Sequence, residues 1–180
     1  MEVQSLYQIA IKFAAKKHHN QTIPGSELPY LLHISNVAME IIIAAQHTPD
    51  FNVELALPIA LLHDTIEDTD TSFMEIEAAF GLDVAKGVLA LTKNDKLPKQ
   101  TKILESISRI KQLQTEVWAV KMADRITNLQ PPPKDWDRAK RIKYKTEAQI
   151  ILNQLKDGNI YLAKRLEKKI IDYSHYFDEI

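Results

Sequence analysis

Hydrophobic residues recur every three or four positions along most of the chain, and this spacing predicts helices. The predicted helices cover residues 3–17, 33–46, 57–70, 72–80, 83–91, 102–113, 116–129, 136–155 and 160–176. No run alternates cleanly between apolar and polar residues, which is the pattern of a half-buried strand. The pattern therefore predicts an all-α fold, a bundle of roughly eight or nine helices.

The ends of several helices are marked by the residues that commonly begin or stop them. Ser72 and Glu75 have the spacing of a capping box, so we expect a helix to begin there. The three prolines at 131–133 stop the helix before them. Pro58 is unfavourable inside a helix, so the central helix is expected to start near Leu57 or to be kinked there.

The central stretch, residues 55–70, combines an apolar first half with a cluster of polar groups. It reads LALPIALLHDTIEDTD and carries His63, Asp64, Glu67 and Asp68. If this stretch is one helix, His63 shares a face with Glu67, and Asp64 shares a face with Asp68. Desolvating four such groups is costly unless a divalent cation offsets the cost. The alternative is a helix end with solvated acidic residues.

Composition limits the classes of protein to which the chain can belong. Its 180 residues, 45% of them hydrophobic, favour a single domain over residues 1–180. With no cysteine, a metal must be held by histidines and carboxylates, which suits Mn, Fe, Zn, Co or Mg. A net charge of -1 gives no reason to expect nucleic-acid or membrane binding. We find no signal peptide and no membrane span, so the predicted location is cytoplasmic.

A second histidine and a second aspartate would complete a metal site. His33 begins a predicted helix, and Asp124 lies on the apolar side of another, in VWAVKMADRITNL. A histidine at a helix start is more often a surface or capping residue. A buried aspartate needs a cation or hydrogen-bond donors, and Arg125 is the competing salt-bridge partner for Asp124.

These residues together resemble the H…HD…D pattern of HD-domain metal-dependent phosphohydrolases. The closer resemblance is to the hydrolase domain of RelA/SpoT homologues, especially the free-standing small alarmone hydrolases. The matching stretches are Pro29-Tyr30 with His33, ALLHDTIEDT (60–69), AAFGLDVAKGVLALTK (78–93) and VKMADRITNL (120–129). They span most of residues 1–155, the family-like core, and a C-terminal helix at 158–178 follows it.

The resemblance implies an all-α HD fold and a metal held by His33, His63, Asp64 and Asp124. Mn²⁺ is the usual metal of the family, with Zn²⁺, Fe²⁺ or Co²⁺ as alternatives. The implied reaction is hydrolysis of the 3′-diphosphate of (p)ppGpp, with release of pyrophosphate. An HD-domain phosphohydrolase acting on another nucleotide or a phosphomonoester is the alternative, because an HD site alone specifies only phosphate chemistry.

The resemblance also implies the roles of residues around the metal. The acid pair, Glu67 and Asp68, would activate water, with Glu67 as the principal base and Asp68 as its partner. The contacts implied for a small nucleotide substrate are Asn128, Lys99, Lys140, Arg141 and Tyr144. Asn128 could instead cap its helix, Tyr144 could belong to the core, and the three cations could be solvated surface charges. Tyr30 is expected in the core.

One loop departs from the family pattern. The family carries a basic pair there that flanks the guanine, whereas this chain reads Gln21-Thr22-Ile23-Pro24. We therefore predict weak or altered base preference, with ppApp as an alternative substrate to ppGpp. Lys16 or Lys17 could restore the missing cation. A homodimer through the amphipathic last helix is a further expectation.

Overall fold

The computed structural model describes residues 2–177, except for the side chains of Lys99 and Gln100. Within these residues the chain forms α-helices, two short 3-10 segments and one isolated β-bridge, between Thr22 and Pro29. The predicted all-α class is confirmed. The α-helices are α1 (Val3–Lys17), α2 (Leu31–Gln46), α3 (Val53–Leu62), α4 (Thr65–Asp68), α5 (Phe73–Phe80), α6 (Leu82–Leu91), α7 (Lys99–Ile110), α8 (Thr115–Asn128), α9 (Arg138–Leu155) and α10 (Ile160–Asp172). The 3-10 segments are η1 (Lys156–Gly158) and η2 (Tyr173–Phe177).

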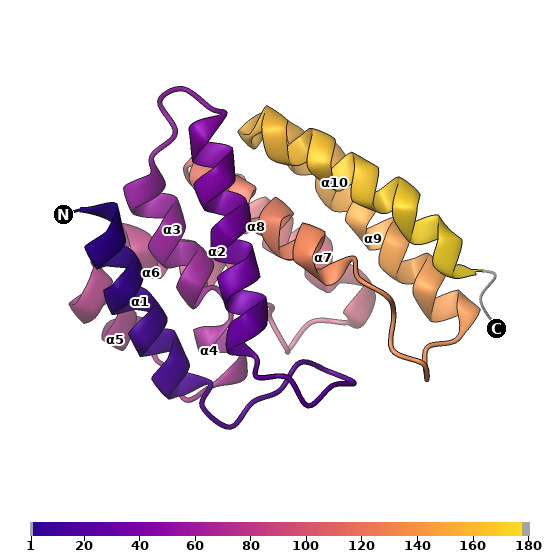
Figure 1. Ribbon diagram of the computed structural model, residues 1–180, viewed down its shortest axis with the longest axis horizontal. Helices are drawn as coiled ribbons and strands as arrows, with labels where there is room; N and C mark the ends of the chain where they lie inside the picture. The colour runs from indigo at the N-terminus through magenta and orange to yellow at the C-terminus, as the bar shows by residue number, and fades with distance from the viewer. Residues whose placement is uncertain (1, 178–180) are drawn as a thin grey trace.

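The helices pack around α3 and α8. In Figure 1, α1, α2 and α3 lie on one side, α9 and α10 run together on the other, and α8 lies between the two groups. Every residue of α3 from Ala56 to Leu62 is buried. Helix α6 approaches α3 closely at Gly87, where an added Cβ would lie 2.5 Å from Ile59 Cδ1. Helix α3 is therefore packed between α6 and α8 as well as against α1 and α2.

The predicted helix at 57–70 is wrong in both its start and its continuity. Helix α3 begins at Val53, because the Asn52 side chain caps it by accepting from the N–H of Leu55 at 3.1 Å. Pro58 lies inside the helix, where it removes one backbone donor. The helix ends at Leu62, and the separate one-turn helix α4 follows. His63 and Asp64 therefore lie in the junction between two helices.

Other predicted boundaries agree more closely with the structure. The capping box is present: the Ser72 N–H donates to Glu75 Oε2 at 2.8 Å, and the Glu75 N–H donates to Ser72 Oγ at 3.2 Å. The following helix ends before Gly81, whose φ of 89° suits glycine. No helix in the described part of the chain is long and apolar enough to cross a membrane.

Candidate active site

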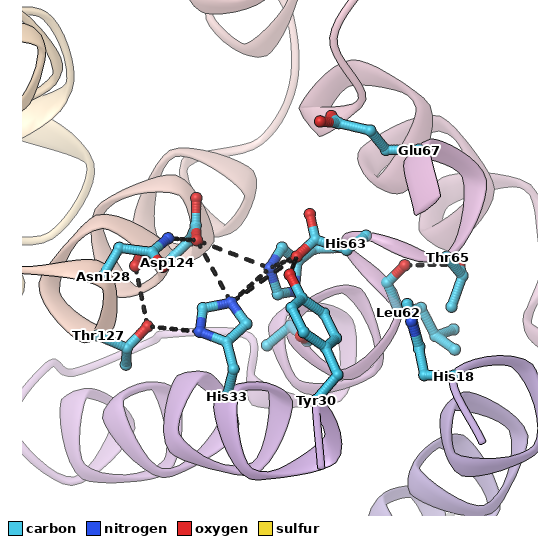
Figure 2. Close-up of polar contacts among 12 residues, drawn as sticks. His18, Tyr30, His33, Leu62, His63, Thr65, Glu67, Asp124, Thr127 and Asn128 are labelled. Carbon is cyan, nitrogen blue, oxygen red and sulfur yellow. Dashed lines mark hydrogen bonds and ion pairs between the residues drawn. The ribbon is translucent and has the colours of Figure 1, made fainter. Parts of the chain in front are cut away.

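The four predicted metal ligands lie together, although they come from three parts of the fold. His33 lies in the first turn of α2, His63 and Asp64 follow α3, and Asp124 lies on α8 (Figure 2). The Nε2 atoms of the two histidines are 3.3 Å apart. Asp64 Oδ2 is 2.8 Å from His63 Nε2, and Asp124 Oδ1 is 3.6 and 3.7 Å from His33 Nε2 and His63 Nε2. His33, His63 and Asp64 thus offer donor atoms that all lie within 4.8 Å of one another, and Asp124 faces the two histidines from α8.

Hydrogen bonds on the far side of each imidazole orient the two rings. His63 Nδ1 lies 2.8 Å from the carbonyl oxygen of Ala60, so it is the protonated nitrogen that donates. Thr127 donates its hydroxyl to the carbonyl of Asp124 at 2.9 Å and can therefore accept from His33 Nδ1 at 3.3 Å. Each histidine thus presents its Nε2 to the cluster, which is how metal-binding histidines are commonly held.

The electrostatics of the cluster also favour a cation. Although burial acts against it, the carboxylates of Asp64 and Asp124 raise the pKa of His63 to about 9. Burial is the main cause that lowers the pKa of His33. Burial would raise the pKa of Asp124, but Lys121 and His63 lower it to about 2. Two carboxylates facing two Nε2 atoms fit a divalent cation, whose charge satisfies all four groups.

Three further side chains hold the two carboxylates in place. Tyr30 donates its hydroxyl to Asp64 Oδ2 at 2.5 Å, which adds a polar contact to the expected packing of Tyr30 against the core. Lys121 Nζ donates to Asp124 Oδ2 at 3.0 Å, and Asn128 Nδ2 donates to Asp124 Oδ1 at 2.5 Å. Lys121, rather than Arg125, is therefore the salt-bridge partner of Asp124.

Sequence reasoning missed Lys121 and Thr127 as supports of the site. Each lies three residues from Asp124 on α8, so helical spacing could have placed them on its face. The contact of Tyr30 with Asp64 had no such signal, because the two residues are 34 positions apart.

The acid pair lies in the one-turn helix α4, just beyond the end of α3. The expected stacking of His63 over Glu67 is wrong, because the helix is interrupted between them. In Figure 2 no dashed line joins Glu67 to either histidine. Its carboxylate accepts from Lys93 instead, from the backbone N–H at 2.8 Å and from Nζ at 2.6 Å. Burial and the charges of Asp64 and Glu67 raise the pKa of Asp68 to about 6.

A pocket of about 410 Å³ lies beside His33. Asn128 and Tyr144, two of the predicted substrate contacts, line this pocket, which we call the His33 pocket. Ile23 and Pro24, from the loop that lacks the basic pair, form part of its wall. The pocket therefore brings together one histidine of the cluster, an amide, an aromatic ring and an apolar wall.

Of the three cations predicted to bind phosphate, Lys140 and Arg141 lie beside Trp136. The side chain of Lys99 lies outside the described residues. Lys140 Nζ lies 4.3 Å from the ring centroid of Trp136, which also lines the His33 pocket. Arg141 donates to the carbonyl oxygens of Trp136 at 2.9 Å and Tyr176 at 2.7 Å, so it ties the C-terminal segment to the start of α9.

An all-α bundle that gathers two histidines and two aspartates at the end of a buried helix has the architecture of an HD domain. The HD domain family model matches residues 10–157, and the chain belongs to this family. The family resemblance predicted from the motifs is therefore confirmed.

Named relatives show which branch of the family the chain is similar to. It is 30% identical over 167 residues to guanosine-3′,5′-bis(diphosphate) 3′-pyrophosphohydrolase MESH1 of Danio rerio, covering 90% of this chain and 91% of the relative. The Xenopus tropicalis protein of the same name is 32% identical, over 91% of this chain and 92% of that relative. A solved structure described as a metazoan ortholog of SpoT that hydrolyses ppGpp matches with a TM-score of 0.81 and 29% identity, over 93% of this chain and 95% of that one.

Proposed function

We propose that this protein is a metal-dependent pyrophosphohydrolase that removes the 3′-diphosphate from alarmone nucleotides, (p)ppGpp or (p)ppApp. The observation that carries the proposal is the cluster of His33, His63, Asp64 and Asp124, whose nitrogen and oxygen atoms face one another in the buried centre. The similarity to the MESH1 proteins, over about nine tenths of each chain, supports this choice among phosphate reactions. Residues 1–180 would act as one HD-type domain in the cytoplasm; a homodimer stays a prediction.

The four ligands would hold one divalent cation, which we propose to be Mn²⁺. Their two nitrogens and two carboxylates also suit Zn²⁺, Fe²⁺ or Co²⁺, so the preference for manganese rests on the family resemblance. When bound, such a cation lowers the pKa of water and polarises a phosphoryl oxygen.

We assign the proton transfers to the acid pair. Glu67 is proposed as the principal base or water-orienting group, and its carboxylate is already fixed by two hydrogen bonds from Lys93. Asp68 is its partner. Because its pKa is raised to about 6, Asp68 can gain and lose a proton near neutral pH.

The nucleotide would lie in the pocket beside His33. We propose that Asn128 contacts the ribose and base, since it lines the pocket and is anchored to the ligand Asp124. Tyr144 would form the wall opposite the apolar loop, with Lys99 and Lys140 drawing in the phosphates. Ile23 and Pro24 offer no charge to the base, so we propose weak discrimination between guanine and adenine.

The test is a comparison of kcat/KM for ppGpp, ppApp, GTP and nucleoside monophosphates with Mn²⁺, using Asp64→Ala as the inactive control. We expect both alarmones to be cleaved with similar efficiency and the other nucleotides to be poor substrates. A guanine preference above about tenfold, or roughly 1.4 kcal/mol, would contradict the weak base preference. Turnover of monophosphates alone would overturn the alarmone assignment and support a different phosphohydrolase.

A further inference from the structure

A second cavity, of about 280 Å³, lies next to the metal cluster and is lined mainly by cationic side chains. We call it the cationic pocket. Its charged lining residues are Lys93, Lys102, Lys121, Arg125, Lys143 and Glu147. Lys121 connects it to the cluster, because its Nζ donates to one oxygen of Asp124 while the other oxygen faces the histidines. A single carboxylate therefore separates the two sites.

Arg125 brings to the cationic pocket buried hydrogen-bond donors that have no acceptor among the described residues. It is 7% exposed, and its Nε and Nη1 are buried without a hydrogen-bond partner in the described structure. Its Nη2 lies 3.8 Å from Glu147 Oε2, beyond hydrogen-bond reach. The guanidinium lies over the ring of Tyr144, 4.4 Å from its centroid. Buried donors without acceptors are costly, so the position favours a ligand that supplies acceptor oxygens.

Three lysines of the pocket form ion pairs, and two of these pairs can be weakened so that the lysine becomes available to an anion. Lys93 pairs with Glu67, and Lys121 pairs with Asp124. A divalent cation on Asp124 would compete for that carboxylate charge and leave Lys121 more available to an anion. The partner of Lys102 is Asp95, which is 88% exposed, so this pair is weakly held.

Lys143 adds a charge without a compensating acid. The described part of the structure shows no ion pair or hydrogen bond of its ammonium group. The cavity volume of about 280 Å³ is several times the roughly 30 Å³ that one water molecule takes in the liquid, so the pocket is larger than a single-water site.

We propose that the cationic pocket is a polyphosphate subsite that binds a diphosphate group, with the Arg125 guanidinium as its central contact. The proposal rests on the proposed function for the source of that group. The diphosphate is either the 3′-diphosphate, retained as pyrophosphate after cleavage, or the 5′-phosphates of the same nucleotide. Both offer pairs of oxygens that match the donor fork of an arginine.

The first measurement is calorimetric binding of inorganic pyrophosphate to the full, Mn²⁺-loaded chain, with metal content checked after each titration. Arg125→Gln should weaken binding by about tenfold or more, since a charge-assisted contact is lost. Lys143→Gln should weaken it by about threefold, since an exposed charge contributes less. Lys86→Gln removes the same charge from an exposed position on α6 outside the pocket and should leave the dissociation constant within about twofold.

The second measurement identifies the source of the diphosphate by comparing ppGpp with Gpp, which has the same 3′-diphosphate and a 5′-hydroxyl. If the pocket holds the 3′-diphosphate, Arg125→Gln lowers kcat/KM for both substrates equally. If it holds the 5′-phosphates, only ppGpp is affected. Either result supports the subsite when pyrophosphate binding is also weakened.

Unchanged pyrophosphate affinity in both Arg125→Gln and Lys143→Gln would overturn the subsite. If Arg125→Gln fails to fold, as judged by thermal melting, pyrophosphate binding by the exposed Lys143→Gln variant decides the question.

Pyrophosphate binding needs no turnover, so it tests the diphosphate subsite separately from the proposed hydrolase function. A chain that binds pyrophosphate through this pocket but cleaves no alarmone would keep the subsite and lose the proposed function.

Discussion

Lys93 holds the Glu67 carboxylate with two hydrogen bonds, one from its backbone N–H at 2.8 Å and one from its ammonium group at 2.6 Å. The contact joins the one-turn helix α4 to the segment that follows α6. Although partial burial acts against it, the charge of Glu67 raises the pKa of Lys93, so the lysine stays protonated. The proposed base is thus positioned by a residue 26 places further along the chain.

Glu67→Gln should retain the metal and lose turnover. The substitution removes the proton acceptor while keeping the shape of the side chain, so kcat should fall by about 10²–10⁴-fold. Glu54→Gln, an equal change at an exposed position of α3, is the control and should stay within about twofold of the parent. Metal content and steady-state kinetics measure both effects. Loss of metal with unchanged activity per bound metal would instead make Glu67 a ligand.

His63→Ala and Asp64→Ala should each abolish metal binding and activity. Both residues contribute an atom to the four-ligand cluster, and the two atoms lie only 2.8 Å apart. Elemental analysis of the purified variants gives the metal content. His47→Ala, which removes an exposed histidine stacked on Tyr161, should keep a full complement of metal. A folded and fully active Asp64→Ala protein would rule out the proposed ligand set.

Tyr30→Phe should weaken metal binding without preventing folding. It removes the hydroxyl that donates to Asp64 Oδ2 but keeps the ring that packs against the core. Loss of such an outer-shell hydrogen bond typically costs about 10–100-fold in metal affinity or activity. Competition with a metal chelator measures the change, and Tyr161→Phe is the matched control. An unchanged affinity would show that the cluster does not depend on this bond.

Metal binding at pH 7.5 should release about one proton. The pKa of His63 is raised to about 9 by Asp64 and Asp124, so in the metal-free protein at this pH the ring carries a second proton, on Nε2, beside the one on Nδ1. The metal needs the neutral ring, so its apparent affinity should rise as pH increases toward about 9 and fall as pH decreases. Calorimetry in buffers with different ionisation enthalpies counts the proton. Identical binding heats in all buffers would contradict this prediction.

The sequence by itself determined the all-α class and most helix boundaries, and its resemblance to HD-domain phosphohydrolases identified the four clustered residues. The helices depend on local signals, namely helical periodicity and the capping box at Ser72 and Glu75, whereas the four residues were recognised from the ALLHDTIEDT and VKMADRITNL motifs together with His33. Local hydrogen bonds and side-chain direction act over a few residues, so they can be predicted from neighbouring positions.

Only the tertiary structure decided where the acid pair and the arginine point. The helix break after Leu62 places His63 outside the one-turn helix that carries Glu67, whose carboxylate binds Lys93. The other predicted pair keeps its helical spacing, because the Asp68 N–H donates to the Asp64 carbonyl at 2.9 Å. Arg125 lies against Tyr144, and Lys121 forms the ion pair with Asp124 for which Arg125 was the competing candidate. The contact with Lys93 joins residues far apart in sequence, and the ion pair with Asp124 selects one of two cations on the same helix. They depend on how helices pack, which hydrophobic periodicity does not encode.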